Sequence, residues 1–368
     1  MTVLGLGKRL LGLDHGGDRY QYVNDPVRGP VHASRGADRW VKSTCGYCSV
    51  GCGMLLGVRG DRVVTVAGDP DHPVNRGRLC PKGLSEHHTL TAPGRLTTPT
   101  IAGAQVSWDD ALDRVVGDFH RLLDEHGPES VAILSTGQLV TEEFYALGKL
   151  ARLGMGLAHY DGNTTLCMAS AVSGYKLSFG TDGPPGCYDD LSEADVVVLW
   201  GANIADNHPL LVPRLLANES MELIVVDPRV TKTAQLADQH VPVAPRTDVT
   251  LLNAILRILV DEGLVDLVAA RGLVSELDEL LAHLAAVDLD ASALECGVSP
   301  AEIRRMALAI GRAERCLVAW SMGVNHSAQG TETVTLLNTM CVLTGNIGRP
   351  GAAPFSITGQ CNAMGTRE

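Results

Sequence analysis

Short apolar runs alternate with amphipathic segments along most of this chain, and this alternation restricts its fold more than any other feature. The apolar runs lie at residues 130–136, 194–203, 221–229 and 315–323. Segments with helical spacing lie at 107–127, 141–155, 208–218, 247–263, 274–287, 299–314 and 330–346. Wholly apolar strands are buried on both faces, which requires helices on each side of a parallel sheet. The pattern therefore predicts doubly wound α/β domains whose ligands bind at the carboxyl ends of the strands.

Composition limits the partners and the location of the protein. The 368 residues suffice for two or three cores, and the formal net charge of −12 disfavours nucleic acid and anionic membranes as partners. No apolar run is long enough for a membrane span, and residues 1–30 contain neither a secretory signal nor a twin-arginine motif. We therefore expect a cytoplasmic protein, in which ten cysteines are more often metal ligands or buried thiols than disulfides.

Four of the cysteines lie in one stretch with metal-ligand spacing. Cys45, Cys48 and Cys52 are followed, after 27 intervening residues, by Cys80 and a proline. Structural zinc more often uses two C-x2-C pairs, whereas an x3 gap and a lone Cys-Pro are typical of iron–sulfur proteins. The motif favours a [4Fe-4S] cluster, with structural zinc and unligated thiols as alternatives. Two short strands are expected within residues 54–69.

Lys82 follows Cys80 by two residues. Its ammonium could bridge the cluster to whatever lies behind it, although on residue type alone a solvated surface lysine is the simpler interpretation.

Further motifs extend this pattern to about residues 41–368. In order they are RLCPKG, SWDDALD, LSTGQ, DGNTTLCMASAVSGYK, YDDLSEADVVVLWGANIADNHP, VVDPR, PRTDVTLLNAI, WSMGVNH and TGNIGRPGAAPFSITGQCNAMGTRE. Their order and spacing resemble the molybdopterin oxidoreductases that carry bis-molybdopterin guanine dinucleotide, the dimethyl-sulfoxide-reductase superfamily. The resemblance implies that fold, with a small amino-terminal iron–sulfur domain followed by doubly wound α/β domains.

The resemblance also assigns the metal ligands and the electron path. It implies that the four cysteines hold the cluster, that Lys82 passes electrons to one pterin, and that Cys167 is the protein ligand of molybdenum. A soft thiolate suits that metal, although Cys167 taken alone would be interpreted as a buried thiol. Met168 and Met322 are expected to form an apolar wall beside the metal. Five other cysteines are expected to be buried thiols, namely Cys187, Cys296, Cys316, Cys341 and Cys361.

Strand ends supply the groups that a guanine dinucleotide needs. Gly201 and Asn203 follow an apolar strand just before a helix, a geometry that favours phosphate. Asp227 closes the next strand and can accept from ribose hydroxyls, Arg229 can pair with phosphate, and Asp248 can accept both guanine N–H groups. The full set of cofactor contacts that the resemblance implies is Lys82, Gln138, Asn163, Trp200, Gly201, Ala202, Asn203, Asp206, Asn207, Asp227, Arg229, Arg246, Thr247, Asp248, Met322, Gly323, His326, Gly359, Gln360 and Asn362. Arg246 stands where the family more often has glycine.

The residue after Cys167 points to a substrate. Cys167 followed by Met168 resembles nitrate reductases, whereas formate dehydrogenases usually have selenocysteine or Cys followed by His. The motif TGNIGRPGAAPFSITGQCNAMGTRE likewise resembles the cytoplasmic, assimilatory nitrate reductases. We therefore predict reduction of nitrate to nitrite by oxygen-atom transfer, with ferredoxin, flavodoxin or an NADH-linked subunit as electron donor. The alternatives are a formate dehydrogenase alpha subunit, a non-catalytic electron-transfer subunit of the same fold, and a bare iron–sulfur module.

The expected domain organisation follows from the motifs. Residues 1–40 are predicted to be an irregular extension, 41–97 the [4Fe-4S] domain, 98–164 the first part of one α/β domain, and 165–368 a second α/β domain that binds a guanine dinucleotide. Because family members are considerably longer, we expect a carboxyl-terminal remainder and a further dinucleotide-binding domain to be absent from this chain.

Overall fold

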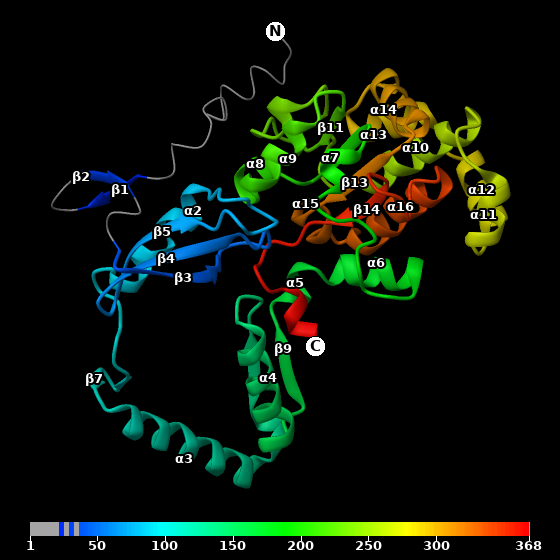
Figure 1. Ribbon diagram of the computed structural model, residues 1–368. Coiled ribbons are helices and arrows are strands. Elements are labelled where there is room, and N and C mark those ends of the chain that lie inside the picture. The colour runs from blue at the N-terminus through cyan, green and yellow to red at the C-terminus, as the bar shows by residue number, and fades with distance from the viewer. Residues whose placement is uncertain (1–21, 26–28, 33–36, 368) are drawn as a thin grey trace. The chain divides into compact units, whose positions relative to one another are not determined.

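The computed structural model describes residues 22–25, 29–32 and 37–367, which belong to two compact units (Figure 1). The sheet unit comprises Leu166–Gly359. The cysteine unit comprises the described residues up to Thr165, together with Gln360–Arg367. In the part of the chain that is described, no helix has both the length and the apolar character needed to cross a membrane.

The sheet unit is built on five parallel strands. They are β10 (Val196–Trp200), β11 (Glu222–Val226), β12 (Gln239–Val241), β13 (Cys316–Trp320) and β14 (Ala353–Ser356). Their order is β12-β11-β10-β13-β14, and every neighbouring pair runs parallel. The predicted parallel α/β sheet is therefore confirmed. The strand order changes direction between β10 and β13, and ligands of such sheets bind outside the carboxyl ends at this switch point.

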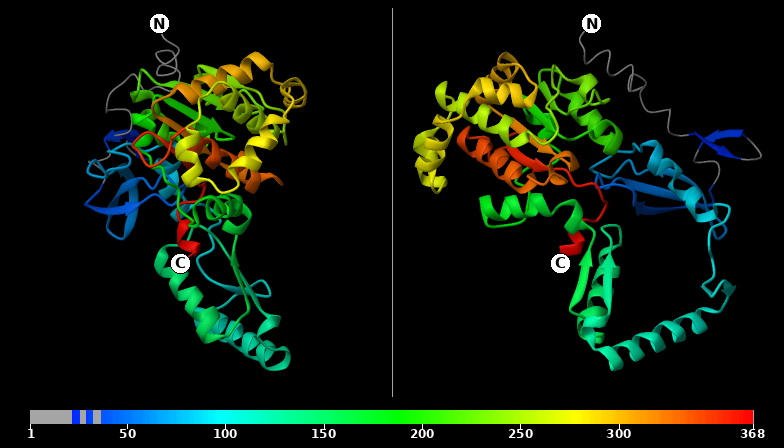
Figure 2. Two further views of the ribbon diagram at one scale, coloured as in Figure 1. Left: turned by 90° about the vertical axis from the view of Figure 1, so that its right-hand side faces the viewer. Right: turned by 180° about the vertical axis from the view of Figure 1, so that it is seen from behind.

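Both faces of this sheet are buried. On β10, Val196, Val198 and Trp200 join one hydrophobic core, and Val197 and Leu199 on the opposite face have no exposed surface. Figure 2 shows helices flanking the sheet. The helices of this unit are α6 (Ala169–Phe179), α7 (Asp190–Glu193), α8 (Ile204–Asn207), η6 (Pro209–Leu211), α9 (Val212–Ala217), η7 (Ala234–Leu236), α10 (Asp248–Asp261), α11 (Leu267–Leu273), α12 (Leu277–Ala285), α13 (Leu289–Cys296), α14 (Pro300–Arg312), α15 (Met322–Asn325) and α16 (Gly330–Leu343).

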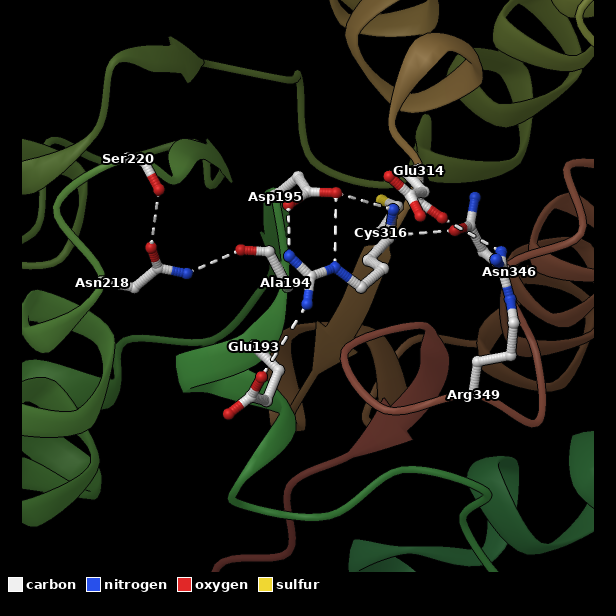
Figure 3. A network of polar contacts seen from close by, with 10 residues as sticks. Glu193, Ala194, Asp195, Asn218, Ser220, Glu314, Cys316, Asn346 and Arg349 are labelled. Atoms are coloured by element: carbon white, nitrogen blue, oxygen red, sulfur yellow. Dashed lines mark hydrogen bonds and ion pairs between the residues drawn. The ribbon is translucent and has the colours of Figure 1, made fainter.

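Ion pairs and amide contacts close the amino ends of β10 and β13 (Figure 3). Arg315 places Nη2 2.8 Å from Asp195 Oδ1, and its backbone N–H donates to the same carboxylate. Asn346 Oδ1 accepts from the backbone N–H of Cys316 at 2.8 Å, and Asn218 Nδ2 donates to the Ala194 carbonyl at 2.7 Å. This edge of the sheet is thus occupied by contacts within the protein.

The cysteine unit begins with small antiparallel sheets. β3 (Arg39–Thr44), β4 (Gly53–Arg59) and β5 (Arg62–Gly68) pair in order, and the turn between β4 and β5 confirms the predicted hairpin. β1 (Tyr22–Asp25) and β2 (Gly29–His32) form a two-stranded hairpin in the stretch that was expected to be irregular. The rest of 1–36 lies outside the described residues. α2 (Pro81–Ser85) and η3 (Glu86–Thr91) follow Cys80.

The remainder of the cysteine unit holds one long helix and a two-stranded parallel sheet. Its elements are β6 (Thr100–Ile101), β7 (Ala104–Gln105), α3 (Trp108–His126), η4 (Pro128–Ser130), β8 (Ala132–Ser135), α4 (Thr141–Lys149), η5 (Leu150–Gly154), β9 (His159–Gly162), α5 (Thr164–Cys167), which runs on into the sheet unit, and η8 (Met364–Arg367). Ser107 Oγ caps α3 by accepting from the Asp110 N–H at 3.1 Å, as the sequence predicts. β8 was expected to be buried, but Leu134 is 87% exposed. The reason is that, among the described residues, β8 pairs with β9 alone and packs one face, through Ile133.

Candidate functional site

The first three cysteines lie in the loop that joins β3 to β4. The Cys45 N–H donates to the Cys52 carbonyl at 2.8 Å, which closes the loop at the base of the two strands. Gly51 has a φ of +66°, which L side chains rarely adopt, and its N–H donates to the Cys48 carbonyl at 3.3 Å. The compact turn therefore follows from glycine at the position that needs a left-handed backbone.

Burial and backbone amides together set the character of these thiols. Burial raises the pKa of Cys45 and of Cys52 to about 12. The backbone amide of Tyr47 donates to the Cys45 sulfur and opposes this rise in pKa, and the amide of Val50 does the same at Cys48. Amide N–H groups aimed at sulfur stabilise thiolates, so the donor set fits an iron–sulfur cluster.

The four thiols share one neighbourhood. Cys52 interacts electrostatically with Cys48 and Cys80, Cys48 with Cys80, and Cys45 with Cys52. Within the described ranges, no three Cys, His, Asp or Glu side chains are grouped closely enough to hold a metal ion. The four sulfurs are soft, free and half-buried or buried, which is the donor chemistry of a cluster ligand set.

Asn75 ties the distant cysteine to the other three, and sequence reasoning missed it. Its side chain is 3% exposed. Oδ1 accepts from the Gly53 N–H at 2.8 Å, and Nδ2 donates to the carbonyls of Gly53 at 2.9 Å and of Arg78 at 2.7 Å. Gly53 follows Cys52, and Arg78 precedes Cys80 by two residues, so these bonds fix the separation of the two ligands. The sequence feature that could have indicated this role is that Asn75 is the one asparagine between Cys52 and Cys80.

Lys82 lies on α2, which begins directly after Cys80. Its ammonium lies 5.3 Å from the centre of the Tyr47 ring. Burial raises the pKa of Cys48, and the Lys82 charge opposes part of that rise. The lysine is therefore held beside the cysteine site rather than extended into solvent, and its role in electron transfer stays a prediction.

In the sheet unit, Cys167 contacts a residue from the switch point. Its Sγ lies 3.3 Å from Met322 Sδ, and Met322 follows β13. Met168 is 3% exposed and packs in the core, where its sulfur accepts from Asn325 Nδ2 at 3.2 Å. That Met168 forms an apolar wall beside the metal together with Met322 stays a prediction.

Two glycines at the switch point allow a close backbone approach. The Gly323 N–H donates to the Gly201 carbonyl at 3.1 Å. A Cβ on Gly201 would lie 2.8 Å from Gly323 Cα, and a Cβ on Gly323 would lie 2.6 Å from Gly201 Cα. The segments that follow β10 and β13 therefore pack backbone against backbone, with no side chain between them.

A polar network follows β10. Asn203 Nδ2 donates to Asp206 Oδ2 at 2.9 Å, and Asn203 Oδ1 accepts from the Thr233 hydroxyl at 2.8 Å. Lys232, which sequence reasoning missed, pairs with Asp206 Oδ1 at 2.6 Å. This pair places a cation beside the strand end where phosphate was predicted.

The polar residues after β11 and β12 are also ordered. Asp227 is buried, and its Oδ1 accepts from the Arg229 N–H at 2.9 Å. The Arg229 side chain is exposed. Arg246 has a φ of +74°, the conformation that glycine adopts without strain, so the family's usual glycine at this position has a structural reason. Thr247 is buried and precedes α10.

Asp248 and Trp200 form one unit. The Trp200 indole N–H donates to Asp248 Oδ1 at 2.7 Å, and Trp200 is 1% exposed. Trp200 can therefore act on a ligand only by holding this carboxylate, which keeps spare acceptor capacity. Burial raises the pKa of Asp248, and the bond from Trp200 opposes that rise.

This pKa shift predicts a trade-off at Asp248. A carboxyl whose pKa is raised on folding costs stability as the pH rises from 3.8 through the raised pKa, and the cost persists at neutral pH. We expect Asp248→Asn to stabilise the cofactor-free chain at pH 7, to flatten the pH dependence in that window, and to weaken retention of the dinucleotide about 10- to 100-fold. Urea denaturation at several pH values and cofactor content check this result, and a variant less stable than wild type at pH 7 would contradict it.

In the cysteine unit, four predicted contacts are brought together by the loop after β8. Asn163 Oδ1 accepts from the Gly137 N–H at 3.0 Å. Asn362 donates its N–H to the Gly137 carbonyl at 2.9 Å and its Nδ2 to the Leu139 carbonyl at 2.8 Å. Gln360 Oε1 also lies against Gly137, and Gln138 is exposed in this loop.

The other predicted contacts lie at three places. Ala202 is 1% exposed, and Asn207 is exposed at the end of α8. His326 follows α15 and is exposed. A Cβ on Gly359 would lie 3.8 Å from the Met322 methyl group. Among the five cysteines expected to be buried, Cys187 is exposed and Cys361 is half-buried, and the other three are buried.

The chain belongs to the molybdopterin oxidoreductase family. The sequence model of that family matches residues 95–367, and the model of the molybdopterin oxidoreductase Fe4S4 domain matches residues 38–90. The predicted family and fold class are therefore confirmed, and the matched domains are those that carry a molybdopterin and a 4Fe-4S cluster.

Similar proteins include several named nitrate reductases. The assimilatory nitrate reductase of Haloferax mediterranei is 44% identical over 335 residues, which is 89% of this chain and 46% of the relative. The nitrate reductase of Klebsiella oxytoca is 38% identical over 89% of this chain and 38% of its own length. The periplasmic nitrate reductase of Desulfovibrio desulfuricans is 37% identical over 89% of this chain and 46% of its own length. The chain thus spans less than half the length of these relatives.

A solved structure shares the fold. Acetylene hydratase from Pelobacter acetylenicus superposes with a TM-score of 0.75 at 20% identity, over 85% of this chain and 44% of that one. At this identity the likeness concerns the fold alone.

Proposed function

We propose that the protein to which this chain belongs reduces nitrate to nitrite. The observation that carries the proposal is the similarity of 89% of the chain to relatives named nitrate reductases, at 37–44% identity. Cys167, followed by Met168 and in contact with Met322, adds to it. When bound, molybdenum held by two pterin guanine dinucleotides supplies a two-electron centre that accepts an oxygen atom, and a [4Fe-4S] cluster supplies single electrons.

The chain's own residues have defined tasks in this proposal. Cys167 provides a soft ligand at the switch point, where Met322 limits the space beside its sulfur. The four cysteines would hold the cluster, and Lys82 would pass electrons between the cluster and one pterin. Nitrate takes up two electrons and two protons, and nitrite and water leave.

Dinucleotide binding is divided among the strand ends. Asp248, held by Trp200, accepts from guanine, and Asp227 accepts from ribose. Lys232 and Arg229 offset phosphate charge, while Gly201 and Gly323 let the ends of β10 and β13 pack closely beneath the cofactor site. The predicted domain division assigns one dinucleotide to the sheet unit.

The donor and location also belong to this proposal. A ferredoxin, a flavodoxin or an NADH-linked subunit would supply electrons, and the assimilatory relative favours a cytoplasmic location. A periplasmic relative covers the same share of the chain, 89%, so the location is best tested by cell fractionation.

Steady-state assays with a viologen dye test the substrate. Reduced viologen with nitrate should give nitrite in proportion to molybdenum content, and oxidised viologen with formate should remain oxidised. Dye reduction by formate without nitrite formation would identify a formate dehydrogenase. A purified protein that holds iron but no molybdenum would identify an electron-transfer subunit.

A further inference from the structure

A carboxylate reaches into the cysteine site from the helical turn after Cys80. Glu86 ends α2 and begins η3, six residues beyond Cys80. Its Oε1 accepts from the Gly46 N–H at 3.1 Å, and Gly46 lies directly after Cys45 in the ligand loop. The segment that follows the fourth cysteine therefore returns to the first.

Two glycines make room for this approach. A Cβ on Gly46 would lie 3.0 Å from Glu86 Oε1, and a Cβ on Gly83 would lie 3.4 Å from Cys45 Sγ. Side chains at either position would press the carboxylate or α2 away from Cys45. The local sequence thus holds a negative charge close to one ligand sulfur.

The second oxygen of this carboxylate is enclosed by protein. Glu86 Oε2 is buried, and no nitrogen or oxygen of the described residues donates to it. The charge of the carboxylate is therefore poorly screened, and the Gly46 N–H holds it beside Cys45.

Charges of opposite sign lie on the two sides of the cysteine site. Glu86 is bound to the Gly46 N–H, next to Cys45, whereas the Lys82 ammonium lies 5.3 Å from the centre of the Tyr47 ring, next to Cys48. A negative charge opposes the addition of an electron nearby, and a positive charge favours it. The electrostatic potential across the site therefore favours an added electron on the side of Lys82 over the side of Glu86.

We propose that Glu86 is a positioning residue that fixes the Cys45–Cys48 loop through the Gly46 amide and lowers the reduction potential of the bound cluster. The proposal rests on a cluster at the four cysteines, which iron and acid-labile sulfide content check separately from nitrate turnover. It is independent of the substrate, because the potential is measured without nitrate.

The test is a redox titration of the cluster's EPR signal in the holoprotein. Glu86→Gln keeps an oxygen acceptor for the Gly46 N–H and removes the charge. We expect unchanged iron content and a more positive midpoint potential, with the reduced-to-oxidised ratio at a fixed potential raised about tenfold, which is 59 mV for one electron. Asp71→Asn is the matched control, since it removes the same charge from a side chain that is 81% exposed, and its potential should stay near wild type.

Two results would overturn the proposal. The first is a Glu86→Gln potential no more positive than that of Asp71→Asn. If Glu86→Gln fails to hold iron, Glu86→Asp decides, because it keeps the charge but withdraws it from Cys45 by one methylene. Glu86→Asp should then show a smaller positive shift, and an unchanged potential would contradict the role assigned to Glu86.

Discussion

Replacement of Cys167 by alanine should abolish nitrate reduction while the iron–sulfur signal persists. Cys167 presents its sulfur at the switch point of the sheet, 3.3 Å from Met322 Sδ. Loss of a group that only orients a metal ligand costs 10- to 100-fold, so loss of the ligand itself should exceed about 100-fold. The cysteine unit contains none of the altered atoms, and its EPR signal should be retained. Nitrite formation with reduced viologen and EPR on the same sample measure both effects.

A matched control separates the ligand role from the loss of a buried thiol. Cys341 is 1% exposed in the core of the same unit, and Cys341→Ala removes the same sulfur atom. It should lower stability modestly and leave turnover per molybdenum unchanged. Cys167→Ser should fall between wild type and Cys167→Ala, since it keeps a ligand atom but a harder one. Turnover of Cys167→Ala within tenfold of wild type would refute the assignment.

The sequence predicted the parts of this fold that depend on periodicity. The strands at 196–200, 222–226 and 316–320 were recognisable because each contains at least four consecutive apolar residues, which a sheet covered on both faces accommodates. The same rule failed at residues 132–135, where Leu134 is 87% exposed. An apolar run reveals that a strand can be buried, but not that a second layer of protein is present to bury it.

Candidate site residues were predictable where their chemistry is unusual. Thiols at metal spacing and a carboxylate before a helix are recognisable as residue types. Asn75, Glu86 and Lys232 were missed because their roles depend on contacts between segments that the sequence does not join. The role of Met168 was not predictable from its residue type, since a methionine next to Cys167 fits a core and a cavity equally well, and its 3% exposure shows only that it packs in the core.

The close approach of β10 and β13 leads to the second large effect. Gly201 has a φ of +56°, and a Cβ there would lie 2.8 Å from Gly323 Cα. Gly201→Ala should therefore meet two costs, roughly 1–2 kcal/mol for a left-handed backbone and about 1–3 kcal/mol for overpacking against backbone that cannot rotate away. We expect a loss of about 2–5 kcal/mol in the free energy of unfolding, together with reduced molybdenum content, because the displaced strand ends carry the predicted cofactor contacts.

Gly297→Ala distinguishes these two costs. Gly297 has a φ of +65° in the same unit, and nothing lies within 4 Å of its would-be Cβ. This variant should lose only the free energy that a left-handed backbone costs, and its molybdenum content should equal that of wild type. Urea denaturation of both variants beside wild type gives the difference, which should be about 1–3 kcal/mol in favour of Gly297→Ala. Equal stabilities would show that the strand ends can separate at little cost, and the switch point would then be a flexible opening rather than a rigid cradle for the cofactor.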